Sequence, residues 1–454
     1  MFQPPAILRR DFLRIGSLSL GGLGLPGLLS ASEKPKKKAK SCIVLFMWGG
    51  PAQQDTWDMK PDAPVEYRGE FKPISTNVPG IQVCEHLPQL AQRTDKLCLI
   101  RSMTHTDVNH LTATHHLLTG KPSPPGPRTD DWPNYGAVLA KLGRGKGPLP
   151  PYVSMMPVVP DGAPRFVEES HGQGAGWLGP QYEPMRIDAD ASKPDYRVGE
   201  FALQGDTNAG RLDARSRLLK SFDANLKSSD GLSEAMGTHY ERAFALLANP
   251  TVASAFDLSK EPQKVRERYG MNRHGQSVLQ ARRLVEAGVP LITVFWPNDG
   301  ITNVSVYWDT HQRNFIDLKT RLCPVTDQAF SALLDDLQNR GMLDDTLVVW
   351  TGEMGRTPRV GQSVVGGAGA GRDGRDHWGK VFTTVLAGGG VKGGAVYGAS
   401  DRFAAEPKLN PTSPVDLAAT IYHLLGVNPR TEILDRLGKP SLLCDGKVIE
   451  EILA

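Results

Sequence analysis

Several short runs rich in apolar residues recur along the chain, and most of them end at glycine, proline or a polar residue. They are residues 42–48, 97–103, 151–160, 290–296, 346–350 and 381–387. The run 42–48, CIVLFMW, is apolar throughout and stops at a Gly-Gly-Pro sequence. Runs that are apolar at successive positions, rather than at alternate ones, indicate strands buried on both faces of a parallel sheet. We therefore predict that these runs form one central sheet.

Segments with apolar residues at helical spacing separate these runs. In residues 326–340, five apolar residues fall on one helical face, and Gly341 follows as a terminator. Further helices are predicted for residues 85–93, 276–287 and 413–425, and for a segment that ends at Gly120. Strands that alternate with helices along a chain predict an α/β fold with a mostly parallel sheet.

The first 32 residues differ in character from the rest. Arg9 and Arg10 precede an apolar, glycine-rich segment, residues 15–29, and small residues follow it. Two adjacent arginines, an apolar stretch and small residues are the parts of a twin-arginine export signal. The apolar stretch is too short and too rich in glycine for a stable membrane span. We expect the twin-arginine export machinery to deliver the protein to the periplasm or to another exported location.

The remaining chain is long enough for one large α/β domain. Residues 33–41 are rich in lysine and form a predicted linker, and residues 42–454 form the predicted domain. Residues 210–288 have mostly helical patterns and are a candidate for an inserted helical cap. The net charge of +3 is spread along the chain and gives no indication of nucleic-acid binding. The cysteines include no C-x-x-C pair, and a Cys84–Cys98 bridge is left open.

Acidic residues and histidines lie next to the predicted strands. They are Asp55 after the first run, Asp309 and His311 after residues 290–296, Glu353 after residues 346–350, and Asp376 and His377 before residues 381–387. Ligands bind outside the carboxyl ends of the strands in open α/β sheets, so we expect these side chains to converge. A mixture of carboxylates and imidazoles suits a divalent cation such as zinc, manganese or calcium. We predict a site for one or two such ions.

Each of these residues alone has a simpler interpretation. An aspartate after a strand is most often a turn residue or a helix cap, and a single histidine is most often a hydrogen-bonded loop residue. Arg356, three residues after Glu353, either holds a tetrahedral oxyanion through paired hydrogen bonds or forms a salt bridge with a nearby acid. The glycine-rich segment 366–371 follows no strand, so we interpret it as flexible rather than as a phosphate-binding loop.

Five motifs in the chain are specific enough to suggest a family. They are GGP-x-x-x-DTWD at residues 49–58, WDTH at 308–311, GEMGRTP at 352–358, GRDHW at 374–378 and AGGGVKGG at 387–394. These motifs resemble an exported bacterial family, domain of unknown function 1501, which in turn resembles a distant branch of the alkaline phosphatase and sulfatase superfamily. The resemblance implies a three-layer α/β sandwich, with a central mostly parallel sheet and helices on both faces.

The resemblance also implies an activity and a set of ligands. By this likeness, Asp309, His311 and His377 hold one ion, and Asp55 and Glu353 hold a second ion that carries the nucleophile. The implied activity is hydrolysis of phosphate or sulfate esters, on small-molecule or polysaccharide substrates. One or two divalent ions would polarise the ester oxygen and activate the nucleophile.

The chain departs from the superfamily pattern at two positions. Met354 stands where the superfamily has a histidine or asparagine ligand, and His110 falls near the position of the nucleophile. His110 could be a ligand, a general base or a transient phosphoryl acceptor. Thr112, Thr114 or a water molecule activated by the ion could attack instead. Two alternatives to the hydrolase follow: an exported, non-catalytic protein that keeps the fold and part of the site, and a metal-free carbohydrate-binding protein.

Overall fold

The computed structural model describes residues 39–145, 149–156, 163–196, 198, 250–301, 305–364, 367–435 and 437–454. The described residues belong to one compact unit, Lys38–Ala454. The predicted export signal, residues 1–32, lies outside the described residues. So does most of the predicted cap, residues 210–249.

An eight-stranded sheet runs through the centre of this unit. Its strands are β1 (Ser41–Phe46), β4 (Leu97–Met103), β5 (Tyr152–Met155), β6 (Met185–Ile187), β7 (Leu291–Phe295), β8 (Thr346–Thr351), β11 (Phe382–Ala387) and β12 (Ala395–Tyr397). Their order across the sheet is β12-β4-β11-β8-β1-β7-β5-β6. Among these strands β11 alone runs antiparallel to its neighbours, β4 and β8. The mostly parallel sheet predicted from the apolar runs is therefore confirmed.

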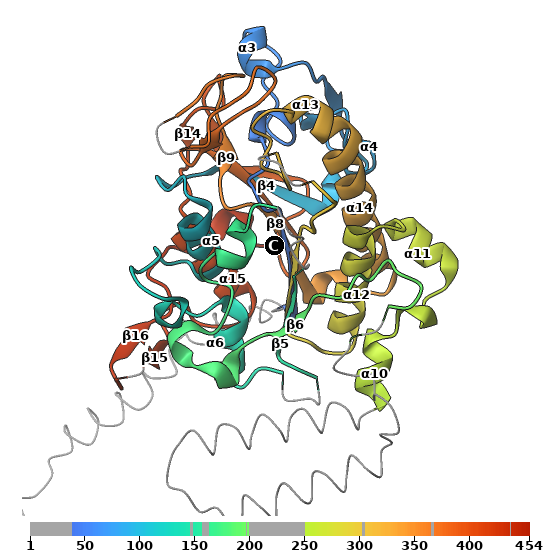
Figure 1. Ribbon diagram of the computed structural model, residues 1–454, viewed down its shortest axis with the longest axis vertical. Coiled ribbons are helices and arrows are strands. Elements are labelled where there is room, and N and C mark those ends of the chain that lie inside the picture. Colours follow the sequence, from blue (N-terminus) through green and yellow to red (C-terminus); the bar gives the residue numbers. More distant parts are fainter. Residues whose placement is uncertain are drawn as a thin grey trace, which may run out of the picture. The chain divides into compact units, whose positions relative to one another are not determined.

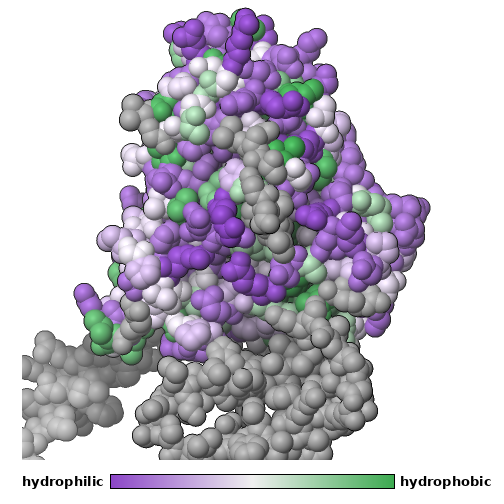
Figure 2. Space-filling model, viewed as in Figure 1, coloured by the Kyte–Doolittle hydropathy of each residue, from purple (hydrophilic) through white to green (hydrophobic). Residues whose placement is uncertain are grey.

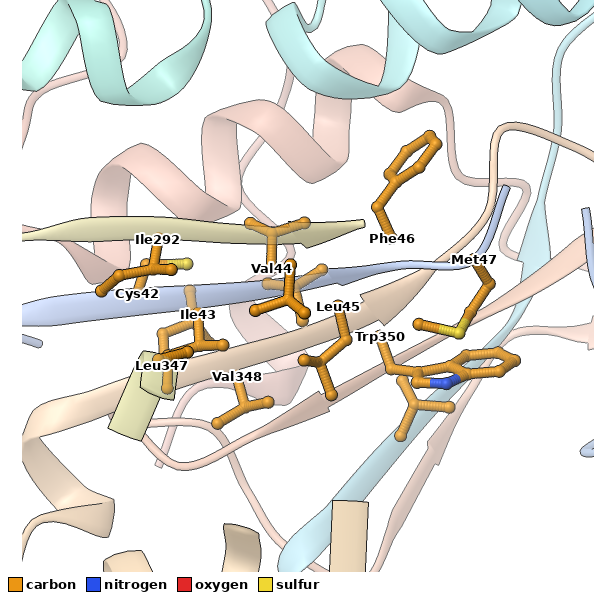
Figure 3. Close-up of a cluster of buried hydrophobic side chains, with 14 of the residues drawn as sticks. Cys42, Ile43, Val44, Leu45, Phe46, Met47, Ile292, Leu347, Val348 and Trp350 are labelled. Carbon is orange, nitrogen blue, oxygen red and sulfur yellow. The ribbon is translucent and has the colours of Figure 1, made fainter. Parts of the chain in front are cut away.

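β1 lies near the middle of the sheet and forms part of its core. All of its residues are buried, and it pairs in parallel with β7 on one side and β8 on the other. Figure 3 shows its side chains packed with Ile292 of β7 and with Leu347, Val348 and Trp350 of β8. Burial on both faces explains why the sequence of this strand shows no polar alternation.

Helices cover both faces of the sheet (Figure 1). One layer contains α4 (Pro88–Ala91), α10 (Pro250–Phe256), α11 (Gln263–Tyr269), α12 (Arg273–Glu286) and α14 (Cys323–Asn339). The other contains α5 (His110–Thr119), α6 (Tyr135–Lys141) and α15 (Pro414–Leu424). α12 contacts β1, β7 and α14. The described part of the predicted cap therefore belongs to a layer of the sandwich, and the three-layer α/β architecture is confirmed.

Smaller elements surround this sandwich. They are the ribbons β2 (Pro73–Ser75) with β3 (Gln82–Cys84), β9 (Gly355–Arg356) with β10 (His377–Trp378), β13 (Ala399–Ser400) with β14 (Pro407–Leu409) and β15 (Glu432–Leu434) with β16 (Pro440–Leu442), and the short helices α3 (Val65–Arg68), α7 (Phe166–Glu169) and α13 (Asn314–Asp317). The β9–β10 ribbon places Arg356 opposite His377. It thereby joins the segment after β8 to the segment before β11.

Local sequence signals fix both ends of α5. The Asn109 side chain accepts a hydrogen bond from the Leu111 amide and caps the start of the helix. Gly120 ends the helix with a φ of 73°, and a Cβ there would lie 2.3 Å from Cβ of Ala418. His110 is therefore the first residue of α5, at the end where backbone amides have no partner within the helix.

The surface and the cysteines agree with an ordinary globular domain. Figure 2 shows a mostly hydrophilic face with small, scattered hydrophobic spots. All five cysteines fall within the described residues, and each is a buried free thiol, so Cys84 and Cys98 are not bridged. None of the helices in the described ranges has the length and apolar character needed to cross a bilayer.

Candidate metal centre

Four of the predicted site residues meet beyond the carboxyl ends of β1 and β8. Asp309, His311, His377 and His110 are all buried, and each offers one ligand atom within 4.8 Å of the others. Asp309 and His311 lie in the segment that follows β7, whereas His377 begins β10 and His110 begins α5. Segments distant in the sequence thus deliver one carboxylate and three imidazoles to a single point.

Asp309 and two of the histidines are in direct contact. Nε2 of His311 lies 2.8 Å from Oδ1 of Asp309, and Nε2 of His377 lies 3.3 Å from the same oxygen. The two Nε2 atoms are only 3.0 Å apart. One carboxylate oxygen and two ring nitrogens therefore face one another across a very small space.

The hydrogen bonds of the two Nδ1 atoms show which ring nitrogen of His311 and His377 carries a proton. Nδ1 of His311 lies 2.6 Å from the carbonyl oxygen of Gly369, and Nδ1 of His377 lies 2.7 Å from that of Val108. A carbonyl oxygen can only accept, so each Nδ1 carries a proton, and in the neutral imidazole Nε2 is then the acceptor that faces the cluster. Metal-binding histidines are held in this way, with the other ring N–H donated to a carbonyl or carboxylate.

These donors fit a divalent cation. Two imidazole lone pairs and a carboxylate oxygen repel one another unless positive charge lies close to them, and the Arg356 guanidinium supplies part of that charge at Asp309 Oδ1 and His311 Nε2. Nitrogen and oxygen donors of this kind are ligands that zinc and manganese accept. Burial lowers the pKa of His377, which keeps its imidazole neutral and available as a ligand near neutral pH.

His110 contacts Asp309 through one ring nitrogen and the carboxylate of Glu353 through the other. Its Nδ1 lies 2.5 Å from Oε1 of Glu353, and its Nε2 lies 3.3 Å from Oδ2 of Asp309. Burial alone would lower the pKa of His110, but the carboxylates of Asp309 and Glu353 outweigh burial and raise it to about 9. The ring of Phe166, in α7, stacks on the imidazole with centroids 4.3 Å apart.

Glu353 is held at the carboxyl end of β1. Its Oε1 accepts a hydrogen bond of 2.8 Å from the amide of Gly49 and also contacts His110. Its Oε2 is buried and has no hydrogen-bond partner in the described part of the chain. The carboxylate therefore orients His110 and retains an unused acceptor, although it is not one of the four clustered ligands.

Arg356 lies inside the cluster and is fully buried. Its Nε donates to Gly50 O at 3.0 Å, and its Nη1 donates to Arg375 O at 3.3 Å and to His311 Nε2 at 3.4 Å. Its Nη2 contacts both Gly49 O and Asp309 Oδ1. All five guanidinium N–H groups therefore have acceptors within the protein.

This arrangement decides between the two interpretations of Arg356. An arginine that grips an oxyanion through paired hydrogen bonds needs two free N–H groups, and the structure leaves none. The salt bridge with Asp309 is what forms. Burial alone would raise the pKa of the Asp309 carboxyl, but the Arg356 guanidinium and His110 hold it well below its usual range.

Asp55 lies in a separate ion pair. Its two oxygens accept from Nε and Nη2 of Arg375 at 2.6 and 3.0 Å, and Asn314 donates to it at 2.8 Å. The second ion site expected between Asp55 and Glu353 is therefore not formed as predicted. Asp55 is engaged by a guanidinium, and Glu353 contacts His110 instead.

Asp376 supports the cluster from outside. Its carboxylate accepts from the amides of Val364 and His377 at 2.8 and 2.9 Å, and it lies 3.4 Å from Nδ1 of His311. A Cβ at Gly367 would lie 2.2 Å from Oδ1 of Asp376. The described part of the glycine-rich segment thus packs closely against Asp376, and Gly369 holds His311.

Three residues that the sequence analysis did not assign to the site contribute to it. Gln53 bonds both the amide and the carbonyl of Arg356, each at 3.0 Å. A Cβ at Gly49 would lie 2.3 Å from the Asp309 amide nitrogen, which explains a glycine three residues beyond the end of β1. Phe166 covers His110. The Gly49-Gly50 pair could have indicated a close approach of another segment to the backbone, whereas nothing in the sequence distinguished Gln53 or Phe166 as site residues.

The fold and the cluster together define an α/β protein with a buried His/Asp group that could hold a metal ion. Residues 39–453 match the family described as protein of unknown function (DUF1501), and the chain belongs to this family. The family predicted from the motifs is thereby confirmed. A search of curated proteins finds no match to the chain.

Solved structures of low similarity include three hydrolases. A sulfatase, PsFucS1 from Pseudoalteromonas sp., is 12% identical, with 91% of this chain and 72% of that chain covered and a TM-score of 0.35. The phosphonate monoester hydrolase SpPMH from Silicibacter pomeroyi is 13% identical, with 92% and 76% covered and a TM-score of 0.34. The alkaline phosphatase from the Antarctic bacterium TAB5 is 9% identical, with 86% and 99% covered and a TM-score of 0.38. Similarities this low say nothing about the activity of the chain.

Proposed function

We propose that the protein is an exported, metal-dependent hydrolase of phosphate or sulfate esters. The observation that carries this proposal is the convergence of Asp309 Oδ1 with the Nε2 atoms of His311 and His377. The Arg356 guanidinium reaches Asp309 Oδ1 and His311 Nε2, and a divalent cation would supply the positive charge that the remaining lone pair of His377 calls for. The motif resemblance supplies the reaction class, and small-molecule or polysaccharide esters are the substrates that it implies.

Asp309, His311 and His377 would hold the ion. A divalent cation bound there would polarise an oxygen of the ester and offset the negative charge that develops during hydrolysis. Three protein ligands leave a position open for substrate, which is the usual arrangement of catalytic sites. The backbone carbonyls of Gly369 and Val108 keep both imidazoles aimed at that position.

His110 is the residue placed to transfer a proton or to accept the transferred group. Glu353 holds its Nδ1, which leaves Nε2 facing the cluster. The other candidates are placed less well. Thr114 is completely buried within α5, and Thr112 is two residues from His110 and so lies on a different side of the helix. A carboxylate–imidazole pair whose second ring nitrogen faces the cluster suits proton transfer.

Substitution of the ligands tests the proposal. Asp309→Ala combined with His377→Ala removes two of the three ligands, so we expect the purified variant to lose bound metal and ester hydrolysis together. Elemental analysis and turnover of aryl phosphates and aryl sulfates are the measurements. Full metal content in the double variant contradicts the assignment.

His110→Gln separates proton transfer from metal binding. We expect this variant to keep the ion and to lose turnover by about 100-fold or more, which is the usual contribution of a positioned acid or base. Loss of the ion instead makes His110 a fourth ligand.

The burial of the cluster favours one alternative function, that of a non-catalytic protein with a structural ion. The exposed fractions of His110, Asp309 and His377 are only 8%, 6% and 5%, and Phe166 covers His110. A non-catalytic exported protein with a structural ion would have such a closed site. Metal-loaded protein that hydrolyses neither aryl phosphates nor aryl sulfates supports this rival.

Export is part of the proposal and rests on the sequence alone. Arg9 and Arg10 with the following apolar segment are the basis for the twin-arginine route. We expect cell fractionation to find the mature protein in the periplasm, and to find it in the cytoplasm when both arginines are replaced by lysine.

A further inference from the structure

We infer that the protein has a second binding site, a cavity beside β5, β6 and β7 that holds a neutral sugar unit. The cavity has a volume of about 670 Å³, which is within the range of small-molecule sites. Its described lining includes none of the four clustered ligands of the metal centre. The inference therefore goes beyond the proposed hydrolase and does not depend on it.

The cavity lies at the edge of the sheet where open α/β proteins bind their ligands. Met155, Ile187 and Phe295, which are the last residues of β5, β6 and β7, all line it. Arg273 and His274, at the start of α12, line it from the helical layer. Ligands of open α/β sheets bind in the crevice outside the carboxyl ends of the strands, so this is the position of a binding site.

Two buried aromatic side chains in the wall of the cavity have unused hydrogen-bonding atoms. Trp296 and His274 are both only 2% exposed, and their ring centroids lie 4.3 Å apart. Within the described ranges Nε1 of Trp296 and Nδ1 of His274 have no hydrogen-bond partner, and neither has Nε of Arg321. Burial lowers the pKa of His274 to about 3, so its imidazole is neutral. Because a buried polar atom without a partner costs free energy, these atoms indicate a ligand whose polar groups supply the missing bonds.

The charges in the wall of the cavity balance one another. Among the described residues, the charged side chains that line it are Asp188, Asp190 and Asp299, and Lys193, Arg273 and Arg321. Arg273 pairs with Asp190 at 2.7 Å, and Arg321 pairs with Asp299 at the same distance. Three negative and three positive charges leave no net charge, and both arginines are already engaged by carboxylates. The wall therefore favours a neutral ligand over an anion or a cation.

A sugar ring combines the properties that this cavity requires. Its hydroxyl groups both donate and accept, so they can bond the unpaired ring nitrogens and the paired carboxylates and guanidinium groups. Its C–H faces can pack on the apolar part of the wall, which includes Ile187, Trp296, Pro297 and Val325. An aliphatic chain would leave the polar atoms unpaired, and a phosphate or sulfate group would find no arginine without a counter-charge.

Calorimetric titration of the full-length protein tests this site. Cellobiose, maltose and lactose are the neutral probes, and sodium sulfate and sodium phosphate are the anionic ones, each added to the metal-free and to the metal-loaded protein. We expect at least one disaccharide to bind both forms, and neither anion to displace it. The inference is overturned if none of the three disaccharides binds, if sulfate or phosphate displaces the sugar, or if sugar binding requires the ion. None of these results removes the ion from Asp309, His311 and His377, so the hydrolase proposal fails or stands by its own test.

Ser277→Trp locates the bound sugar. Ser277 lines the cavity from α12, so an indole there would fill part of the space. We expect the affinity for the disaccharide to fall by about 10-fold or more, with the metal content unchanged. Ala287→Trp is the matched control, because Ala287 is exposed directly after the other end of α12 and does not line the cavity. Equal affinities of the two variants contradict the inference. Should Ser277→Trp fail to fold, Trp296→Phe decides: it removes the indole N–H and should weaken binding by about 5-fold, and an unchanged affinity contradicts the inference.

Discussion

Two buried arginine–aspartate pairs, whose arginines are 19 residues apart in the sequence, lie in different surroundings. Arg375 pairs with Asp55, and Arg356 pairs with Asp309. Both guanidinium groups are completely buried, and in both every N–H group has an acceptor. The arginines are therefore equivalent in their hydrogen bonding, and the difference lies in what surrounds each aspartate.

Asp55 receives donors on all sides, because Arg375 and Asn314 both donate to it. Asp309 receives Arg356 but also faces the Nε2 atoms of His311 and His377. Balanced donors and acceptors indicate a structural ion pair, whereas a surplus of acceptors is typical of a group that could hold a cation. The strand-end argument had placed Asp55 and Asp309 in one group, and the count of donors and acceptors separates them.

Asp55→Ala gives the largest effect that we predict from the comparison. It leaves the Arg375 guanidinium buried without its counter-charge, so the free energy of unfolding should fall by about 3–5 kcal/mol. The bound ion should stay, because Asp55 contacts none of the clustered ligands. Urea denaturation and elemental analysis measure the two quantities separately.

Asp55→Asn is the matched control for this prediction. It keeps the shape and one acceptor for Arg375 while removing the charge, so its loss of stability should be smaller than that of Asp55→Ala. If either folded variant loses the ion, Asp55 belongs to the metal centre after all, and the distinction between the two pairs disappears.

The strands and the core could be predicted from the sequence because their signal is local. Residues 42–48 are apolar throughout, residues 290–296 and 346–350 are apolar apart from Thr293 and Thr346, and the structure has β1, β7 and β8 there. β6 and β12 were not predicted, since three-residue strands are too short to show a pattern. The helix predicted for residues 85–93 is shorter in the structure, where α4 has a single turn.

The site was predictable in part. Asp309, His311 and His377 converge as the strand-end argument predicted, because parallel strands bring their carboxyl ends to one edge. The partners of Asp55 and Arg356 were not predictable. Which acid a buried arginine meets depends on the packing of loops such as residues 352–358 and 374–378, and no periodicity in the sequence encodes that.

Glu353→Gln gives the smallest effect of the set and tests how the cluster uses its second acid. Glu353 contacts His110 but is not one of the clustered ligands. Loss of its charge should leave the ion bound and lower turnover by about 10- to 100-fold, as for other residues that orient a functional group from behind.

Because Glu353 acts through His110, the double variant Glu353→Gln, His110→Gln should be no slower than His110→Gln alone, since the two effects are not additive along one chain of contacts. Two results would contradict this role: losses of turnover that add in the double variant, or loss of the ion from Glu353→Gln. Either result would make Glu353 a direct partner of the substrate or the metal. Both acids of the cluster, Asp309 and Glu353, would then differ from Asp55, which only forms an ion pair with Arg375.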